Sequence, residues 1–239
     1  MRKNVFTDVY TFTTENISGY FPSLDLKDKS LLTVGSSGDQ AFNAILCGAG
    51  KVTVMDISPY AEGFIKLKRD MILNYPRRQM YYRTLCNDEF PVSKDYFPFN
   101  DLERMNPYMS SDEKYDELRS RLEHTDIDFI EGDIFNMSAS LGKESFDRIV
   151  FSNILQYVDH YASSYDYNDV EAFIRDSFCE WDYYLNKDGI LQLTYLYSLM
   201  GQKRDLVRIC SALYDKEIYL SKFDNGNNRD KAAILYYRK

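Results

Sequence analysis

Residues 31–58, LLTVGSSGDQAFNAILCGAGKVTVMDIS, carry the pattern from which the architecture of this protein follows. An apolar run at 31–34 ends in the turn-forming Gly-Ser-Ser-Gly, and the apolar residues at 41–46 then have helical spacing. A second β-branched run follows at 52–55. The pattern predicts a strand, a helix and another strand, an alternation typical of parallel sheets with right-handed crossovers.

The same alternation extends toward the C-terminus. Ser58-Pro59 is a favourable opening for a helix that runs to about Asn74. Periodicity and turn residues then predict strands at 127–130, 146–151 and 190–197, helices at 138–141, 169–185 and 203–213, and a hairpin of 217–223 with 232–237 around the turn 225–228. The predicted fold is α/β: a Rossmann-like, seven-stranded, mostly parallel sheet with helices on both faces and a C-terminal antiparallel hairpin.

Two segments stand outside this alternation. Residues 1–29 precede the first predicted strand and are expected to form an N-terminal segment or lid. Residues 75–126 contain four prolines, many tyrosines and one clear helix at 110–122, so we expect a Tyr-rich insertion over one end of the sheet. The remainder, residues 30–239, is expected to be a single domain.

Composition narrows the functional classes. The chain of 239 residues has 29 Lys and Arg against 37 Asp and Glu, a net charge of −8 that disfavours a nucleic-acid surface. Its four cysteines form no Cys-x-x-Cys pair, which argues against a disulfide framework and against a zinc site, so no metal is predicted. We see no signal peptide and no apolar run of spanning length, so a cytoplasmic location is expected.

Polar and small residues follow the predicted strands where an open parallel sheet binds its ligands. The turn from Gly35 to Asp39 lets a backbone approach a ligand closely, although it could equally be a plain strand–helix turn. Asp56 lies 21 residues after Gly35, where a carboxylate can accept hydrogen bonds from ribose hydroxyls, or can cap the next helix. Asp133 could accept a bond from an adenine amino group or act as a cap.

Five segments carry a family resemblance: LLTVGSSGDQ, KVTVMDIS, DFIEGDIF, FDRIVFSNILQYV and LNKDGILQLTYL. In order and spacing they resemble the class I S-adenosylmethionine-dependent methyltransferases over residues 30–239. The resemblance implies that S-adenosylmethionine is the cofactor and that each loop binds a different part of it. The implied contacts are Gly35, Ser36, Ser37 and Gly38 for the methionine part, Asp56 for the ribose, Ile57, Asp133 and Ile134 for the adenine, and Ser152 and Asn153 beneath the reacting centre.

The first loop departs from the pattern of that family. The family usually has an acidic residue two positions before the first glycine, where this chain has Thr33, and a further glycine where it has Ser37. The contact to the cofactor's ammonium would then need another carboxylate. Asp39 is the candidate substitute.

A narrower resemblance concerns the group that is transferred. The variant loop, the helix FIKLKRDMI and the stretch that ends in YDELRSRL are similar to the aminocarboxypropyl transferases of betaine-lipid synthesis. Those enzymes are implied to share fold and cofactor but to move the 3-amino-3-carboxypropyl group. Methyl transfer is the leading hypothesis and aminocarboxypropyl transfer the alternative.

The loop after the fourth predicted strand bears on the acceptor. Asn153 to Tyr157 is unlike the Asn/Asp-Pro-Pro-Tyr loop of amino-methylating nucleic-acid enzymes and looks more like a small-molecule methyltransferase. His160 could be a general base because imidazole titrates near neutral pH, and Tyr157 is the second candidate catalytic residue. The alternative is that His160 is a surface residue on a loop.

The tyrosines cluster in two segments, 75–126 and 157–184, which hold twelve of the 21. Residues 157–188 also carry eight acids and two bases. An aromatic, acidic rim suits an amine-bearing acceptor, although tyrosines also pack under long loops. We expect the two segments to form an acceptor pocket and its lid.

Two other functional classes stay open. An NAD-dependent oxidoreductase would share the sheet, but Gly35-Ser-Ser-Gly38 does not fit Gly-x-Gly-x-x-Gly, and the terminal hairpin is untypical. A non-catalytic methyltransferase-like module would explain the missing acid at Thr33. The sequence does not determine the oligomeric state.

Overall fold

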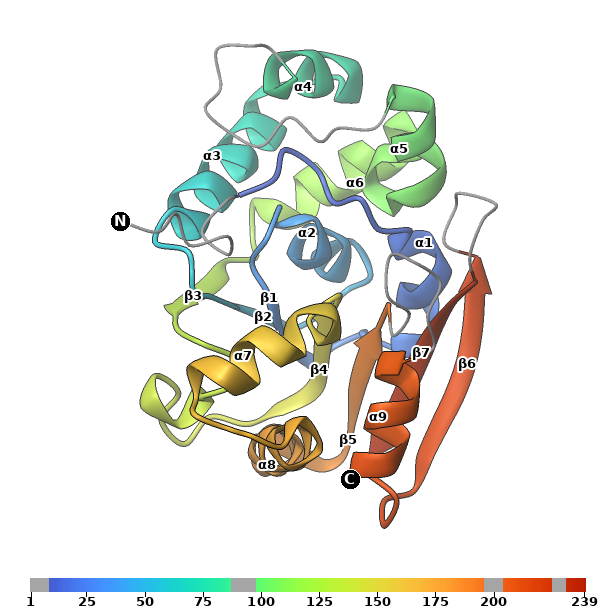
Figure 1. The fold of residues 1–239 in the computed structure, drawn as a ribbon. Coiled ribbons are helices and arrows are strands. Elements are labelled where there is room, and N and C mark those ends of the chain that lie inside the picture. Colours follow the sequence, from blue (N-terminus) through green and yellow to red (C-terminus); the bar gives the residue numbers. More distant parts are fainter. Residues whose placement is uncertain (1–8, 87–97, 196–203, 225–230) are drawn as a thin grey trace. The chain divides into compact units, whose positions relative to one another are not determined.

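A computed structural model describes residues 9–86, 98–195, 204–224 and 231–239 (Figure 1). The chain divides into two compact units, Met1–Ile134 and Phe135–Lys239. We call them the first and the second unit and describe each by itself.

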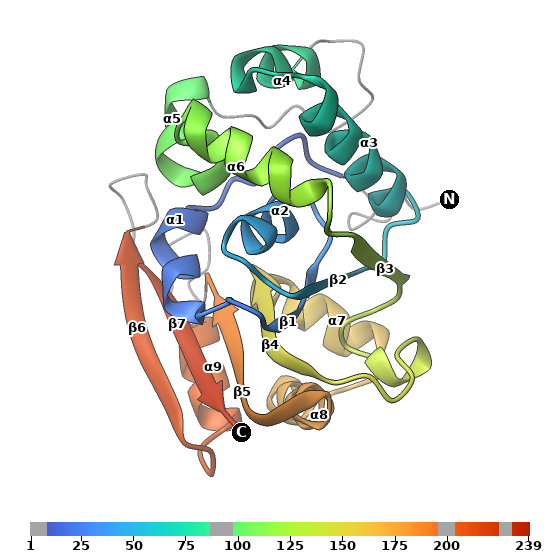
Figure 2. The same cartoon turned by 180° about the vertical axis from the view of Figure 1, so that it is seen from behind.

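The first unit holds three parallel strands in the order β3-β2-β1 (Figure 2). They are β1 (Ser30–Val34), β2 (Lys51–Asp56) and β3 (Ile127–Glu131). The interior residues of β1 and β2 are buried, as the continuous apolar runs of parallel strands require. The strands predicted at 31–34, 52–55 and 127–130 are therefore confirmed to within one residue at each end.

Helix α2 (Asp39–Leu46) packs on β1 and β2, and all of its residues are buried. Helix α6 (Asp112–Leu122) packs against α2 and against α3 (Ala61–Asn74). Ser111 caps α6 by accepting a hydrogen bond from the Lys114 amide at 3.2 Å. A helix covered on both sides in this way has no solvent-exposed face, so its polar residues Asp39, Gln40 and Asn43 are buried together with its apolar ones.

The insertion is more regular than its sequence indicates. Besides α6 it forms α4 (Arg78–Leu85), α5 (Phe99–Met105) and the 3-10 turn η2 (Pro107–Met109), drawn in green in Figure 1. The helix predicted at 110–122 is present as α6, whereas α4 and α5 were not predicted, because they are short and depend on tertiary contacts rather than on a periodic apolar pattern. Residues 87–97, which include Tyr96, lie outside the described part.

The N-terminal segment is part of the first unit's core. It forms α1 (Ile17–Tyr20) and the 3-10 turn η1 (Phe21–Leu24), and residues 9–16 precede them without forming a helix or a regular strand. The side chains of Phe12, Ile17, Tyr20 and Leu24 have no exposed surface. An apolar segment buried to this degree stabilises the unit, so residues 9–29 do more than cover it.

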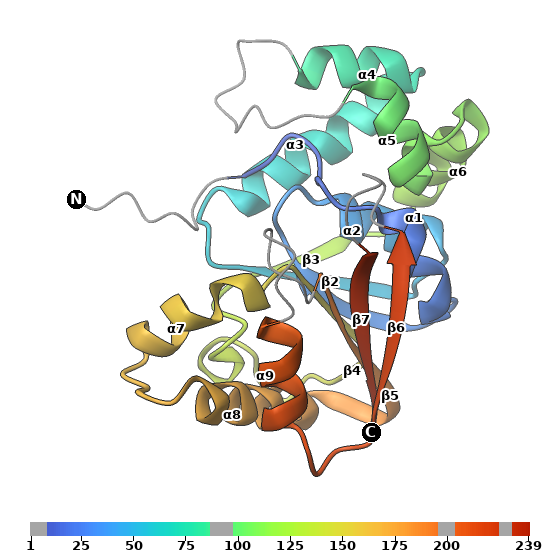
Figure 3. The ribbon, with the colours of Figure 1, turned by 45° about the vertical axis from the view of Figure 1, so that its right-hand side comes forward.

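The second unit continues with β4 (Phe146–Ser152), β5 (Leu185–Thr194), β6 (Ile218–Asp224) and β7 (Lys231–Arg238). Strand β5 is parallel to β4 and antiparallel to β7, and β6 pairs with β7 as the outer strand (Figure 3). Helix α8 (Val170–Tyr183) packs on β5 and against α9 (Arg204–Ala212), and α7 (Val158–Ser164) packs on α8. Two 3-10 turns, Met137–Ala139 and Leu155–Tyr157, complete the unit.

Strand β5 begins five residues earlier than the predicted start at Ile190. The predicted turn Lys187-Asp188-Gly189 lies inside the strand, where the register with β4 shifts between Phe146 and Arg148. The sequence Lys-Asp-Gly indicates a turn, and Asp188 does adopt a left-handed φ of +63°. The strand nevertheless continues through it, with an irregularity in its pairing to β4. The turn expected at 225–228 lies outside the described residues.

The seven strands follow the order β3-β2-β1-β4-β5-β7-β6 in a mostly parallel sheet that ends in an antiparallel hairpin. The predicted Rossmann-like fold class is thereby confirmed. Across the described ranges, no helix has both the length and the apolar character needed to cross a membrane.

Candidate functional site

The loop between β1 and α2 is a tight turn. Its chain reverses through Ser36, which has a φ of +44°, and through Gly38 at +78°. The Gly38 amide donates to the Gly35 carbonyl at 2.7 Å. This left-handed conformation is why the loop contains small residues, and it ends at the first turn of α2.

Asp56, the last residue of β2, holds this loop. Its Oδ2 accepts from the Ser36 amide at 2.7 Å, and its Oδ1 accepts from the Ser58 amide at 2.8 Å. A Cβ atom on Gly35 would lie 2.6 Å from Asp56 Oδ2, so only glycine permits the approach. Burial raises the pKa of the Asp56 carboxyl, and the backbone amides that it accepts from oppose this shift.

The third predicted loop joins the same edge of the sheet. The Gly132 amide donates to the Asp56 carbonyl at 2.9 Å, which sets the residues after β3 beside the end of β2. Asp133 and Ile57 are partly exposed, whereas Ile134 is buried. The structure therefore brings together the sequence-predicted loops at Gly35, Asp56 and Asp133.

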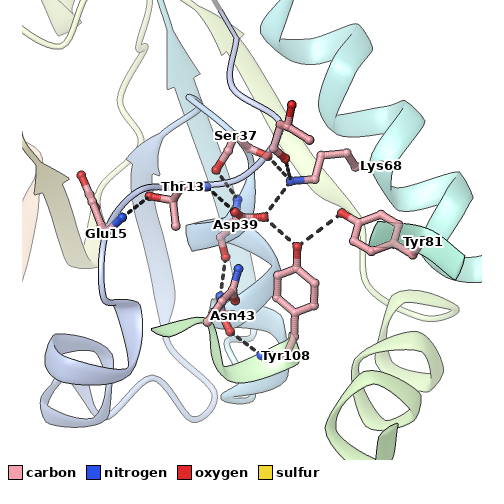
Figure 4. Close-up of polar contacts among 10 residues, drawn as sticks. Thr13, Glu15, Ser37, Asp39, Asn43, Lys68, Tyr81 and Tyr108 are labelled. Carbon is pink, nitrogen blue, oxygen red and sulfur yellow. Dashed lines mark hydrogen bonds and ion pairs between the residues drawn. The ribbon is translucent and has the colours of Figure 1, made fainter. Parts of the chain in front are cut away.

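Asp39 is the centre of a buried polar cluster (Figure 4). Its Oδ1 accepts from Lys68 Nζ and from the Tyr108 hydroxyl, both at 2.7 Å, and its Oδ2 accepts from the Thr13 amide at 2.7 Å. The side chain has no exposed surface. This geometry does not favour the expected contact between Asp39 and a cofactor ammonium, because both carboxylate oxygens already have donors from the protein.

Lys68 lies on α3 and is equally buried. Its ammonium donates to Asp39 Oδ1, to the Ser37 carbonyl at 2.7 Å and to the Thr11 carbonyl at 2.9 Å. The nitrogen also lies 4.8 Å from the ring centroid of Phe12. Burial lowers the pKa of Lys68, while the Asp39 carboxylate acts in the opposite direction.

Two tyrosines of the insertion extend the cluster. The Tyr108 hydroxyl donates to Asp39, so at its 3.3 Å contact with Tyr81 the latter must be the donor. Burial raises the pKa of both hydroxyls well above the ordinary value, and the Asp39 charge adds to the shift. We call Asp39, Lys68, Tyr81 and Tyr108 the Asp39 cluster.

A second set of contacts binds the insertion to α2. Asn43 Nδ2 donates to Asn106 Oδ1 at 2.7 Å, and Asn43 Oδ1 accepts from the Tyr108 amide at 3.1 Å. Tyr81, Tyr108 and Tyr115 are therefore core residues rather than exposed rings. For these three, the packing interpretation of the tyrosine excess holds.

The remaining candidates belong to the second unit. Ser152 ends β4, and Asn153 follows it with a φ of +57° and donates its amide to the Thr194 carbonyl at 3.2 Å. Tyr157 has 37% of its surface exposed, and His160 is exposed on α7. The position of His160 fits the alternative that it is a surface residue.

Sequence reasoning missed Lys68, Thr13 and Tyr108. A signal for Lys68 was present, since it falls at helical spacing from Phe64, Ile65 and Ile72 on the buried stripe of α3. A charged residue on such a stripe needs a buried partner. No comparable local signal marks Thr13 or Tyr108, which reach Asp39 from 26 and 69 residues away.

The four cysteines are free thiols. In the part of the chain that the structure describes, no group of three or more His, Cys, Asp or Glu side chains could hold a metal ion.

No protein-family model and no curated protein matches this sequence. Among solved structures, the chain is similar to a methyltransferase from Pyrococcus furiosus, with 14% identity over 92% of this chain and 79% of that one, and a TM-score of 0.50. The protein described here has the fold of a methyltransferase.

Two other solved methyltransferases are also similar. N-methyltransferase NodS from Bradyrhizobium japonicum WM9 has 14% identity over 91% of both chains and a TM-score of 0.49. Magnesium protoporphyrin IX methyltransferase ChlM from Synechocystis PCC 6803, solved with bound SAM, has 13% identity over 92% of this chain and 74% of that one, and a TM-score of 0.48. The methyltransferase fold that the class I resemblance implied is thus confirmed from the Pyrococcus structure.

Proposed function

We propose that this protein is an S-adenosylmethionine-dependent transferase that methylates a small molecule. The observation that carries the proposal is the contact between Asp56 and the Ser36 amide, which holds the loops after β1 and β2 together at one edge of the sheet. Class I methyltransferases resemble the chain in these loops.

The residues present fit the cofactor. The turn at Gly35, Ser36, Ser37 and Gly38 suits close approach by its methionine part, because it lacks bulky side chains. Asp56 is partly exposed, so its carboxylate can accept ribose hydroxyls while it accepts the two loop amides. We assign the adenine to Ile57, Asp133 and Ile134, and the reacting centre to Ser152 and Asn153.

When bound, S-adenosylmethionine supplies a sulfonium-activated methyl group. The chain's part is to orient an acceptor nucleophile in line with that group and to keep water away, which accounts for much of the rate in such transfers. The acceptor proton must leave, and His160 and Tyr157 are the residues proposed to take it. An amine-bearing acceptor suits the acidic segment 157–188.

A second candidate is transfer of the 3-amino-3-carboxypropyl group. Thr33 stands where the family has an acid, and Asp39 is enclosed by its own donors. Neither position then restrains the cofactor's ammonium, which leaves the amino-acid arm freer to be the group that reacts. The two reactions leave different products, S-adenosylhomocysteine for methyl transfer and methylthioadenosine for the alternative.

The test is incubation of the purified protein with S-adenosylmethionine and a crude metabolite extract, with the nucleoside product identified by mass spectrometry. S-adenosylhomocysteine supports methyl transfer, and methylthioadenosine supports the second candidate. Tight binding without either product would indicate a non-catalytic binding module. Absence of binding would overturn the proposal.

The site assignment is tested with Asp56→Ala, with Asp128→Ala as the matched control. Asp128 is also a strand aspartate, but it is exposed and forms a surface ion pair with Lys51 at 3.3 Å. We expect S-adenosylhomocysteine to bind much more weakly, but still measurably, to Asp56→Ala and with wild-type affinity to Asp128→Ala, measured by calorimetry. A 2′-deoxy analogue separates ribose binding from loop support: if Asp56 binds the ribose, the analogue loses affinity for wild type but loses no more in the variant.

A further inference from the structure

Lys68 connects three segments that are distant in sequence. Its ammonium donates to Thr11 in the stretch of residues 9–16, which we call the N-terminal strap, to Ser37 in the loop after β1, and to Asp39 in α2. The three distances lie between 2.7 and 2.9 Å. An ammonium group has three N–H donors, so each one has its own acceptor.

Two of these acceptors are backbone carbonyls, and this separates Lys68 from an ordinary ion pair. The Asp39 carboxylate neutralises the charge, whereas the Ser37 and Thr11 carbonyls receive directed bonds that fix the path of the main chain. Asp39 adds another bond to the strap through the Thr13 amide. The strap and the loop are thus held by the same pair of charges.

Aromatic rings surround the Lys68 ammonium. Phe12 of the strap lies over the Lys68 nitrogen and packs edge-on against Tyr81 of α4, with ring centroids 5.7 Å apart. Phe42 and Phe64 each have a ring centroid 5.8 Å from that nitrogen. The Lys68 side chain has no exposed surface, so its three hydrogen bonds act in a medium of low dielectric constant, where they are strong.

We propose that Lys68 is a positioning residue of the cofactor site: it sets the conformation of the loop after β1 and keeps the N-terminal strap against it. The inference rests on the proposed function, because that loop is where we place the methionine part of the cofactor. Lys68 itself contributes no contact to the cofactor. Its effect on affinity passes through the Ser37 carbonyl and the strap.

The experiment compares Lys68→Met with the double variant Asp39→Asn/Lys68→Met. The single variant leaves the Asp39 charge buried without a partner, so we expect a less stable protein. The double variant removes both charges. Its amide can accept from Thr13 and donate to Tyr108, so thermal stability should largely return. Lys66→Met, which removes an exposed lysine from the same helix, is the matched control.

Two measurements on the folded double variant test the positioning role. We expect S-adenosylhomocysteine to bind at least tenfold more weakly than to wild type. We also expect faster hydrogen exchange in peptides that cover residues 9–16 and 35–40, with the rest of the first unit unchanged. The exchange measurement needs no cofactor, so it tests Lys68 even if the proposed function fails.

The outcomes separate the two proposals. A double variant with wild-type exchange in both peptides would overturn the positioning role, as would wild-type affinity for S-adenosylhomocysteine. A wild-type protein that binds neither S-adenosylmethionine nor S-adenosylhomocysteine would overturn the proposed function alone. Faster exchange in that case would still assign Lys68 to the loop and the strap.

Discussion

The two units stabilise their interiors in different ways. In the first unit an ion pair, two tyrosine hydroxyls and an asparagine pair are buried around α2. In the second unit the interior between α8 and the strands is aromatic, with Trp181 against Phe151 at 5.3 Å and Phe135 at 5.7 Å between ring centroids. Directed polar contacts fix one conformation of a loop, whereas rings stabilise by area and tolerate small shifts.

The largest expected effect tests the aromatic interior. Trp181 has no exposed surface, so Trp181→Ala should lower the free energy of unfolding by about 3–5 kcal/mol, measured by urea denaturation. Tyr183→Ala, on the same helix but 69% exposed, is the control and should cost less than about 0.5 kcal/mol. Equal losses in the two variants would contradict the contrast between the units.

The next effect tests the loop of the first unit. In Gly35→Ala the new Cβ displaces the Asp56 carboxylate, and we expect a loss of about 1–3 kcal/mol in stability. S-adenosylhomocysteine affinity, measured by calorimetry, should fall at least tenfold. Gly63→Ala in α3, which has open space around it, should instead gain about 0.5–1 kcal/mol. Unchanged affinity in Gly35→Ala would show that the approach of Asp56 is not needed.

A third effect depends on alkaline pH. The pKa values of Tyr81 and Tyr108 are raised in the folded state, so above about pH 10 the unfolded chain loses these protons while the folded chain keeps them. Folded-state stability should therefore fall as pH rises above that value, by about 1.4 kcal/mol per pH unit for each such tyrosine. Tyr108→Phe should reduce this slope in urea titrations between pH 9 and 11. Tyr183→Phe, an exposed control, should leave it unchanged, and equal slopes in all three proteins would refute the assignment.

The smallest effect on stability concerns the second unit's candidate base. His160 is exposed on α7, so His160→Ala should change the free energy of unfolding by less than about 0.5 kcal/mol. As a proposed base for the acceptor proton, His160 is needed for turnover, so product formation in the extract assay should fall a hundredfold or more. A rate within a few-fold of wild type would instead identify His160 as a surface residue with no part in the reaction.

Much of the fold could be predicted because its signals are local. The strands up to β4 follow from apolar runs, and the turn at Gly35 and the position of Asp56 follow from the residues at which these runs end. The early start of β5 and the helices α4 and α5 could not be predicted. The turn-forming sequence around Asp188, which has a positive φ, indicates the end of a strand although β5 continues through it. Short helices depend on the residues that they pack against.

The sequence by itself determined the alternation of strands and helices, and with it the edge of the sheet where Gly35, Asp56 and Asp133 lie, because periodicity and turn residues act over a few positions. Only the tertiary structure decided that Asp39 is enclosed by Lys68, Tyr108 and the strap, and that three tyrosines are core residues. These contacts join residues 29, 69 and 26 positions apart. A buried charge is stabilised by whichever partner the fold brings to it, and local pattern does not encode that partner.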